Sequence, residues 1–272
     1  MDREAFAHAV RQPSVDVPHA ALLLAREIAY PGLPLEPYLE QLDALATSAR
    51  SLTLISDELE QGAALATHLA GEAGFQGNVV AYSDPRNSFL NDVLERRQGI
   101  PITLSIVFIA VARRLGLDAY GIGLPGHFIA GVRAGSRRVL LDPFHGGARL
   151  NLADCQRLVR ETAGYQGPFE RAWLEPVAPP AILARLLNNL RLIYFRLADW
   201  PKALAVLERL QQVQPDEPAH LRDLGLVHYQ QDAYYAAAHY LEAYLEREPD
   251  SPEAIAIRQN LAEEFARWAR MN

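Results

Sequence analysis

The sequence predicts an α+β protein: a layer of N-terminal helices, a buried helix on a short antiparallel sheet, and an all-α domain behind them. Three observations carry this prediction. Almost every residue from Ile102 to Leu115 is apolar, which is typical of a helix enclosed by the rest of its domain. Three strand-like segments separated by turn signals follow this run. A 34-residue sequence period then begins at Trp200.

Composition excludes several classes of protein. The 272 residues carry a net charge of −7 and 50% of them are hydrophobic, which opposes a nucleic-acid-binding surface. The chain begins with charged residues and lacks an apolar leader, and the run Ile102–Ala112 is far shorter than the ~20 residues needed to span a bilayer. The single cysteine, Cys155, forms no internal disulfide and fits a reducing compartment. We therefore expect a cytoplasmic protein that binds neither nucleic acid nor a membrane.

The first hundred residues read as helices, because apolar residues recur there at three- and four-residue spacing. Helices are expected at about residues 18–30, 37–49 and 56–73, with stops at Pro31-Gly32 and Gly74. A loop then leads into a helix from about Ser88 to Arg97, which Asn87 or Ser88 can cap. Asn87 and Asn91 either brace this loop or line a pocket next to His127.

The buried helix begins at Pro101, because the first helical turn tolerates a residue without an N–H group. Gly116 supplies its stop. The strands that follow are expected at Ala119–Leu124, His127–Arg133 and Arg137–Asp142, separated by turns at Pro125-Gly126 and Ala134-Gly135. A further helix is expected at Leu150–Arg160, and the proline- and glycine-rich stretch Gly164–Pro180 is the best linker candidate.

The last two strands bring a histidine and an aspartate together. A two-residue turn at Ala134-Gly135 pairs Arg133 with Ser136, and counting outward places His127 opposite Asp142. Facing residues on antiparallel strands have Cβ atoms about 5 Å apart, so the imidazole and the carboxylate can hydrogen-bond. Such a pair supplies the base and its orienting group in a nucleophile–base–orienter triad.

The C-terminal third repeats itself. Six residues recur after 34 positions: Trp200, Ala203, Leu207, Pro215, Asp216 and Pro218 match Tyr234, Ala237, Leu241, Pro249, Asp250 and Pro252. This period, with small residues where helices cross and proline at the end of each unit, is the tetratricopeptide signature. The sequence therefore predicts a first domain at 1–175 and a repeat domain at 181–272, with two repeats and a closing helix, Pro252–Trp268.

The first domain resembles a known family. The order of its segments resembles the core of transglutaminase-like proteins, relatives of the papain-type thiol enzymes. These segments are the buried helix with Arg-Arg-Leu-Gly ending at Gly116, a strand, Gly-His, a strand and Leu-Asp-Pro. In that family a nucleophilic cysteine opens the buried helix, and the histidine and aspartate arrive on the next strands. The resemblance puts Pro101 at the cysteine position and implies that His127 and Asp142 form a dyad without its thiol.

A closer resemblance is to one bacterial branch of that family. The segment NSFLNDVLERRQGIPITLS is followed by the repeats. This arrangement resembles that of proteins described as regulators of sirC expression, in which tetratricopeptide repeats follow a transglutaminase-like domain. This resemblance covers about residues 15–260. It implies a papain-related fold for the first domain.

Other residues offer alternative chemistry. Thr103 and Ser105 are weak alternative nucleophiles. The helix directs position 101 toward His127, and it therefore directs the side chains of positions 103 and 105 elsewhere. Cys155 has the setting of a small buried hydrophobe. His127, Asp142 and His145 have donor types that suit zinc, but HExxH and paired CxxC spacings are absent. We therefore expect neither a metal nor a cofactor.

Two functions follow from these residues. The first is a regulatory or scaffold protein without transglutaminase catalysis, whose acidic repeats bind a protein or peptide. Between Lys202 and Glu264 there are 12 acidic and 5 basic residues, a net of −7, and the rest of the chain balances to zero. The alternative is a hydrolase or acyltransferase on peptide or amide substrates, with His127 as base, Asp142 as orienter and a hydroxyl group or a water molecule as nucleophile.

Overall fold

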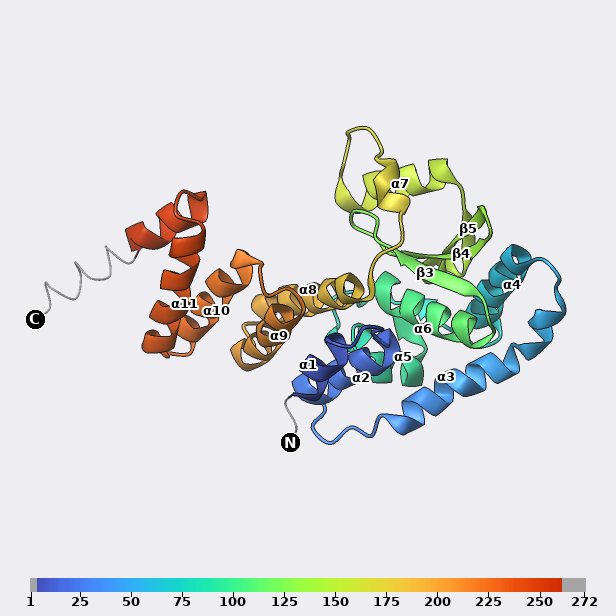
Figure 1. Cartoon of the computed structure of the whole chain (residues 1–272), viewed down its shortest axis with the longest axis horizontal. Helices are drawn as coiled ribbons and strands as arrows, with labels where there is room; N and C mark the ends of the chain where they lie inside the picture. Colours follow the sequence, from blue (N-terminus) through green and yellow to red (C-terminus); the bar gives the residue numbers. More distant parts are fainter. Residues whose placement is uncertain (1–3, 261–272) are drawn as a thin grey trace, which may run out of the picture. The chain divides into compact units, whose positions relative to one another are not determined.

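A computed structural model describes residues 4–260, which belong to two compact units divided between Ile193 and Tyr194 (Figure 1). The first unit combines helices with a four-stranded antiparallel sheet, and the second is built from helices. The predicted α+β class is therefore confirmed. Among residues 4–260, none of the helices combines the length and the apolar character that crossing a bilayer requires.

Acidic side chains cap two of the N-terminal helices, α2 and α4. The Asp16 carboxylate accepts the N–H of His19 at 3.1 Å, and Asp57 accepts the N–H of Leu59 at 2.9 Å. The helices of this layer are α1 (Ala5–Val10), α2 (Val17–Ile28), α3 (Glu36–Ser48), α4 (Glu58–Gly71) and α5 (Leu90–Arg96), with short 3-10 turns η1 (Arg50–Leu54) and η2 (Pro85–Asn87).

Helix α6 (Pro101–Arg114) is the central helix of the first unit. Every residue from Pro101 to Ala112 is buried, as the apolar run predicts. The hydroxyl of Thr103 accepts the N–H of Ile100 at 3.1 Å, so this side chain closes the first turn of the helix. Gly116, with φ +87°, follows the C-cap residue Leu115 and ends the helix.

The main sheet has the strand order β3-β4-β5-β6, and all neighbouring strands are antiparallel. Its strands are β3 (Asp118–Ile122), β4 (Ile129–Ala134), β5 (Arg137–Asp142) and β6 (Ala148–Leu150). A separate parallel pair, β1 (Gln76–Gly77) and β2 (Gln98–Gly99), precedes α6.

The register of the β4–β5 hairpin differs by two residues from the sequence prediction. Ala134 pairs with Arg137 and Arg133 with Arg138, so the turn consists of Gly135 and Ser136 and does not include Ala134. Gly135 has φ +60°, which suits the first central position of a type II′ hairpin turn. His127 therefore lies in the loop before β4 and not opposite Asp142 in the ladder.

Helices cover both faces of the sheet (Figure 1). α6 packs against β3 and β4, and α4 packs against β4, β5 and β6. On the other face, Tyr120, Ile122 and Leu140 pack with residues of α7 (Leu152–Ala163). Asn151 caps α7 and forms a capping box with Asp154.

The proline-rich segment after α7 packs onto the same face as α7. Leu174, in the 3-10 turn η4 (Arg171–Leu174), is buried in the cluster of Ile122 and Leu140. The N–H of Val177 donates to the carbonyl of Gly121 at 2.9 Å. α8 (Pro179–Leu197) follows and contains the division between the two units.

The second unit contains α9 (Trp200–Val213), α10 (Pro218–Gln230) and α11 (Tyr234–Arg247). Ala203 and Ala237, which match across the 34-residue period, are both buried. Gly225 of α10 lies so close to α11 that a Cβ would meet the Leu241 side chain at 2.6 Å. Residues 252–260 are helical, and the rest of the expected closing helix Pro252–Trp268 lies outside the described residues.

Candidate functional site

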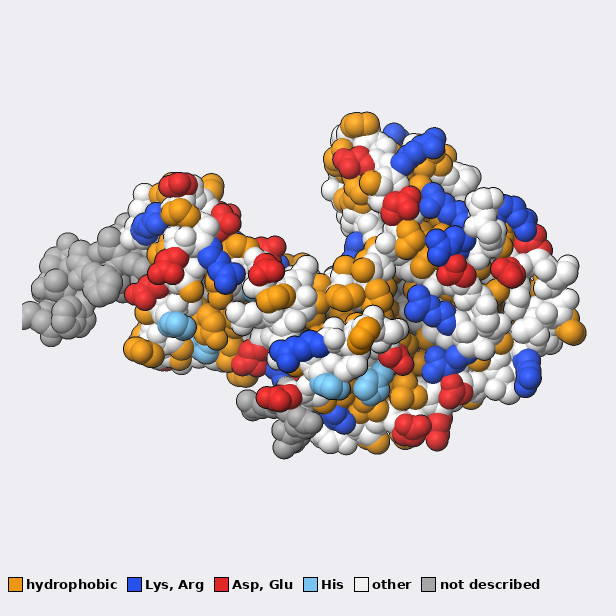
Figure 2. Space-filling view, in the orientation of Figure 1, with side chains coloured by type: hydrophobic (Ala, Val, Ile, Leu, Met, Phe, Trp, Pro, Cys, Tyr) orange, Lys and Arg blue, Asp and Glu red, His pale blue; other side chains and the backbone are white. Residues whose placement is uncertain are grey.

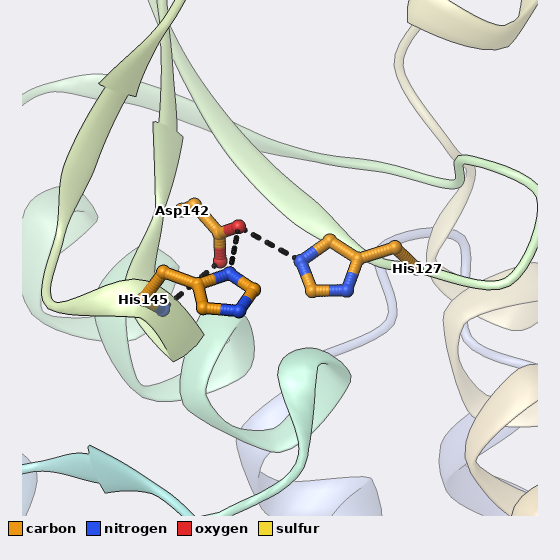
Figure 3. A group of neighbouring side chains, drawn as sticks. All are labelled: His127, Asp142 and His145. Carbon is orange, nitrogen blue, oxygen red and sulfur yellow. Dashed lines mark hydrogen bonds and ion pairs between the residues drawn. The ribbon is translucent and has the colours of Figure 1, made fainter. Parts of the chain in front are cut away.

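Asp142 is the centre of the candidate site. It is the last residue of β5 and caps the 3-10 turn η3 (Pro143–His145): its Oδ1 accepts the N–H groups of Phe144 and His145 at 3.1 and 3.3 Å. These bonds orient the carboxylate, so that Oδ2 faces Nε2 of His127 at 2.9 Å and Nδ1 of His145 at 2.8 Å (Figure 3). One carboxylate oxygen thus serves two imidazoles.

His127 is positioned by a turn and by an arginine. In the turn at Pro125-Gly126, the N–H of His127 donates a hydrogen bond to the carbonyl of Leu124 at 3.1 Å. From α8, Nη2 of Arg185 donates to the carbonyls of Leu124 and His127 at 2.8 and 2.6 Å. Both ends of the turn are therefore held by one guanidinium, which holds the His127 backbone toward Asp142.

The two imidazoles contact each other and the Phe144 ring. The His127 and His145 rings stack with centroids 5.5 Å apart and an interplanar angle of 25°. The Phe144 ring meets both edge-on, at 6.0 Å from His127 and 5.0 Å from His145. Gly77 of β1 lies behind Phe144, because a Cβ there would come within 2.7 Å of the Phe144 ring and carbonyl oxygen.

Burial and hydrogen bonding set the charge of the site. Burial by itself would raise the pKa of Asp142, but the hydrogen bonds from His127 and His145 outweigh it and lower this pKa to about 2. The carboxylate in turn raises the pKa of His145, whose side chain is 50% exposed, whereas His127 and Asp142 are almost fully buried.

The ionised carboxylate also determines which imidazole nitrogens are free. A carboxylate only accepts hydrogen bonds, so Nε2 of His127 and Nδ1 of His145 each donate a proton to it. In a neutral His127 the lone pair is therefore on Nδ1. Among residues 4–260, Nδ1 of His127 makes no hydrogen bond.

The hydroxyl groups proposed as alternative nucleophiles lie in α6. The Thr103 hydroxyl is within hydrogen-bond distance of the backbone carbonyls of Asn87 and Ile100, at 2.8 and 3.0 Å, and accepts the Ile100 N–H. The Ser105 hydroxyl is fully buried and has no partner in the described part of the chain. Pro101 opens the same helix, which packs against β4 and η3.

Asn87 and Asn91 are buried near the start of α5. Nδ2 of Asn87 donates to the carbonyl of Ala81 at 2.7 Å and its Oδ1 accepts from Asn78, so this side chain braces the loop before α5. Oδ1 of Asn91 is buried without a partner within residues 4–260. Among the predicted site residues in the described part, hydrogen bonds join His127 to Asp142 and the Thr103 hydroxyl to the Asn87 carbonyl, and these two pairs are separate.

Sequence reasoning missed three contributors to this arrangement. His145 entered only as one donor of a disfavoured zinc site, and Arg185 and Gly77 were given no role in the site. Arg185 carried one signal, since it is a charged residue in the apolar run Ala181–Leu187 of α8. The close approach of Gly77 to Phe144 had no sequence signal, because 67 positions separate the two residues (144 − 77).

Comparison with known proteins agrees with this architecture. Residues 36–188 match the model of the transglutaminase-like superfamily, and residues 190–262 match a tetratricopeptide repeat model. A UPF0162 protein of Xylella fastidiosa (strain Temecula1) is 34% identical over 247 residues, 89% of this chain and 88% of its own length.

Relatives of lower identity carry the same name or the name SirB1. A UPF0162 protein of Pseudomonas aeruginosa is 32% identical over 66% of this chain and 65% of its own length. Protein SirB1 of Salmonella typhimurium is 24% identical over 88% of this chain and 90% of its own length. No solved structure matches the chain significantly. The chain belongs to the UPF0162/SirB1 family, in which a transglutaminase-like core is joined to tetratricopeptide repeats.

Proposed function

We propose that this chain is a cytoplasmic regulatory or scaffold protein whose repeats bind a protein partner and whose transglutaminase-like domain has lost its catalytic thiol. The observation that carries the proposal is Pro101 at the head of α6, the position that the family resemblance assigns to cysteine. Proline offers no nucleophilic atom. Cys155 does not replace it, because burial raises the pKa of its thiol to about 11 and leaves almost no thiolate at neutral pH.

Acidic charge on the repeats supports the binding role. The net charge of −7 lies between Lys202 and Glu264, and acidic side chains gather over the second unit on the face that Figure 2 shows. Aromatic side chains are exposed where α10 meets α11: Tyr229 and Tyr235 lie on either side of Asp232 in the chain. A partner segment with Lys or Arg beside apolar residues fits such a surface.

The binding role is tested with full-length variants in that surface. Tagged wild-type protein captures its partners from a bacterial extract, and the affinity of a purified partner is then measured. We expect Tyr235→Ser and Asp232→Lys to weaken binding at least tenfold, and added salt to weaken it further. Val80→Ser is the matched control, because Val80 is fully exposed in the first unit. Equal binding by all variants contradicts the proposal.

Two observations favour the second candidate, a hydrolase or acyltransferase on peptide or amide substrates. Nδ1 of His127 is an available base, and the Ser105 hydroxyl has no hydrogen-bond partner among residues 4–260. Hydroxyl- and thiol-reactive activity probes test it: labelling of Ser105 or Thr103 that His127→Gln abolishes supports an enzyme. Absence of labelling, together with absence of His127-dependent amide turnover, supports the scaffold.

A further inference from the structure

Three donor atoms of different residues converge beside η3. Nε2 of His127, Oδ2 of Asp142 and Nδ1 of His145 all lie within 4.8 Å of one another (Figure 3). Two imidazoles and one carboxylate form a donor set that binds divalent transition metals, Zn²⁺ and Fe²⁺ among them. We propose that these three residues form a binding site for a divalent transition-metal ion of the Zn²⁺ class. This site goes beyond the partner-binding function proposed above.

The donor spacing requires only a small adjustment. Ligands at about 2.0–2.1 Å in tetrahedral geometry lie about 3.3 Å from one another. Oδ2 of Asp142 is 2.9 Å from Nε2 of His127 and 2.8 Å from Nδ1 of His145, so each nitrogen must withdraw from the oxygen by about half an ångström. His145 is half-exposed and can make this movement.

A dyad of catalytic type does not account for the second imidazole. One histidine and one carboxylate suffice for a base and its orienter, yet His145 brings another nitrogen to the same Oδ2 atom. A metal ion between the three residues gives each donor a role. Each donor nitrogen then offers its lone pair, and the proton that it donated to Asp142 moves to the other nitrogen of the same ring.

Outer contacts fix the donors in the way that metal sites require. Oδ1 of Asp142 is held by the N–H groups of Phe144 and His145, so Oδ2 keeps its direction. Arg185 holds the carbonyl of His127 at 2.6 Å and thereby the backbone that carries this ligand. Such outer hydrogen bonds typically change metal affinity by about 10- to 100-fold.

Access is from the side of His145. Asp142 and His127 are buried, whereas half of the His145 side chain faces solvent. Three protein ligands leave a tetrahedral metal with one open position, as in catalytic zinc sites. That position can take water or an oxygen atom of a ligand.

The sequence contains neither HExxH nor paired CxxC spacing, and for that reason no metal was expected. This absence does not exclude a metal site at these three residues. Those spacings detect ligands on one helix or in one knuckle. Here 15 residues separate His127 from Asp142, and the fold brings them together.

The test titrates metal-stripped, full-length protein with Zn²⁺ by calorimetry and with Co²⁺ by visible absorption. We expect one saturable equivalent and a Co²⁺ spectrum of low-coordinate type. His145→Ala should weaken Zn²⁺ binding at least tenfold without unfolding the chain, because this side chain is half-exposed. Asp142→Asn should have at least the same effect. His68→Ala is the matched control, since His68 belongs to α4 and is not one of the three donors.

A second measurement keeps the test decisive. Zn²⁺ should raise the melting temperature of the wild type and of His68→Ala, but not that of His145→Ala. Absence of saturable binding, or binding that His145→Ala retains, shows that the three residues form only a hydrogen-bonded cluster and overturns the proposal. Partner binding by the repeats is measured separately, so failure of either proposal is distinguishable from failure of the other.

Discussion

Nε2 of His127 lies 2.9 Å from Oδ2 of Asp142, although the β4–β5 ladder, which pairs Ala130 with Leu141, does not place the two residues opposite each other. The contact depends on the loop that returns His127 to the end of β5. Arg185 and the cap of η3 hold the two sides of this contact. The His127–Asp142 contact therefore depends on Arg185 and on the cap of η3.

Removal of the carboxylate should destabilise the first unit. Asp142→Ala leaves the buried His127 N–H without an acceptor and removes the cap of η3. We expect a loss of about 2–4 kcal/mol in the free energy of unfolding, measured by urea denaturation followed by circular dichroism. Asp118→Ala is the control, because the Asp118–Arg133 pair is exposed and its loss should change stability by about 0.5 kcal/mol or less. Equal losses of stability in the two variants would show that the buried His127–Asp142 pair contributes no more to the free energy of unfolding than the exposed Asp118–Arg133 pair.

Gly77→Ala should disturb the site from outside it. The new Cβ would lie 2.7 Å from the Phe144 carbonyl oxygen, and because this atom is backbone, η3 must shift. We expect a loss of about 1–3 kcal/mol and changed imidazole NMR signals of His127 and His145. Gly71→Ala, at the end of α4, meets nothing within 4 Å and should keep both stability and signals. Unchanged imidazole signals in Gly77→Ala would mean that η3 does not depend on β1.

Tyr30 and Asp92 should give a pH-dependent effect on stability. Burial raises the pKa of Asp92, and the hydrogen bond from Tyr30, with O–O distance 2.5 Å, opposes this rise. Tyr30→Phe therefore raises the pKa of Asp92 further and removes the donor to its charged form. We expect a loss of about 1–3 kcal/mol at pH 7.

The sign follows from the direction of the shift. A carboxyl whose pKa in the folded state exceeds its unfolded value of about 3.9 is destabilising once it ionises. The loss in Tyr30→Phe should therefore shrink as the pH falls from 7 towards 4, which urea titrations at several pH values can measure. Tyr38→Phe is the control, because its partner Glu95 is exposed. A loss that grows on acidification would contradict the assignment.

Cys155 should be unreactive in the native protein. Its side chain is buried against the sheet, and burial raises the pKa of the thiol to about 11. Alkylation by iodoacetamide at pH 7.5, followed by mass spectrometry, should be at least 100-fold slower in native than in urea-unfolded protein, because the thiolate is the reacting form. Native labelling as fast as that of the unfolded chain would reopen the question of a thiol enzyme.

Local sequence pattern was sufficient for several elements. The apolar run predicts α6 because its residues are buried on every side. The 34-residue period, which brings Ala203 and Ala237 into buried positions, predicts the repeats because each repeat has the same packing requirement. The strand segments β3, β4 and β5 follow from alternating residues and glycine turns: the ends of β5 agree with the prediction, and those of β3 and β4 differ by one or two positions.

The sequence by itself determined the long helices and the three longer strands β3, β4 and β5, because these depend on neighbours within a few residues. It did not predict the short strands β1, β2 and β6. Only the tertiary structure decided that Gly135-Ser136 forms the hairpin turn, that Arg185 clamps the His127 loop, and that His145 shares the oxygen of Asp142. The contacts to Asp142 and Arg185 depend on the packing of α8 and η3 around the sheet. No local pattern encodes that packing, because its energy comes from groups that are distant in the chain.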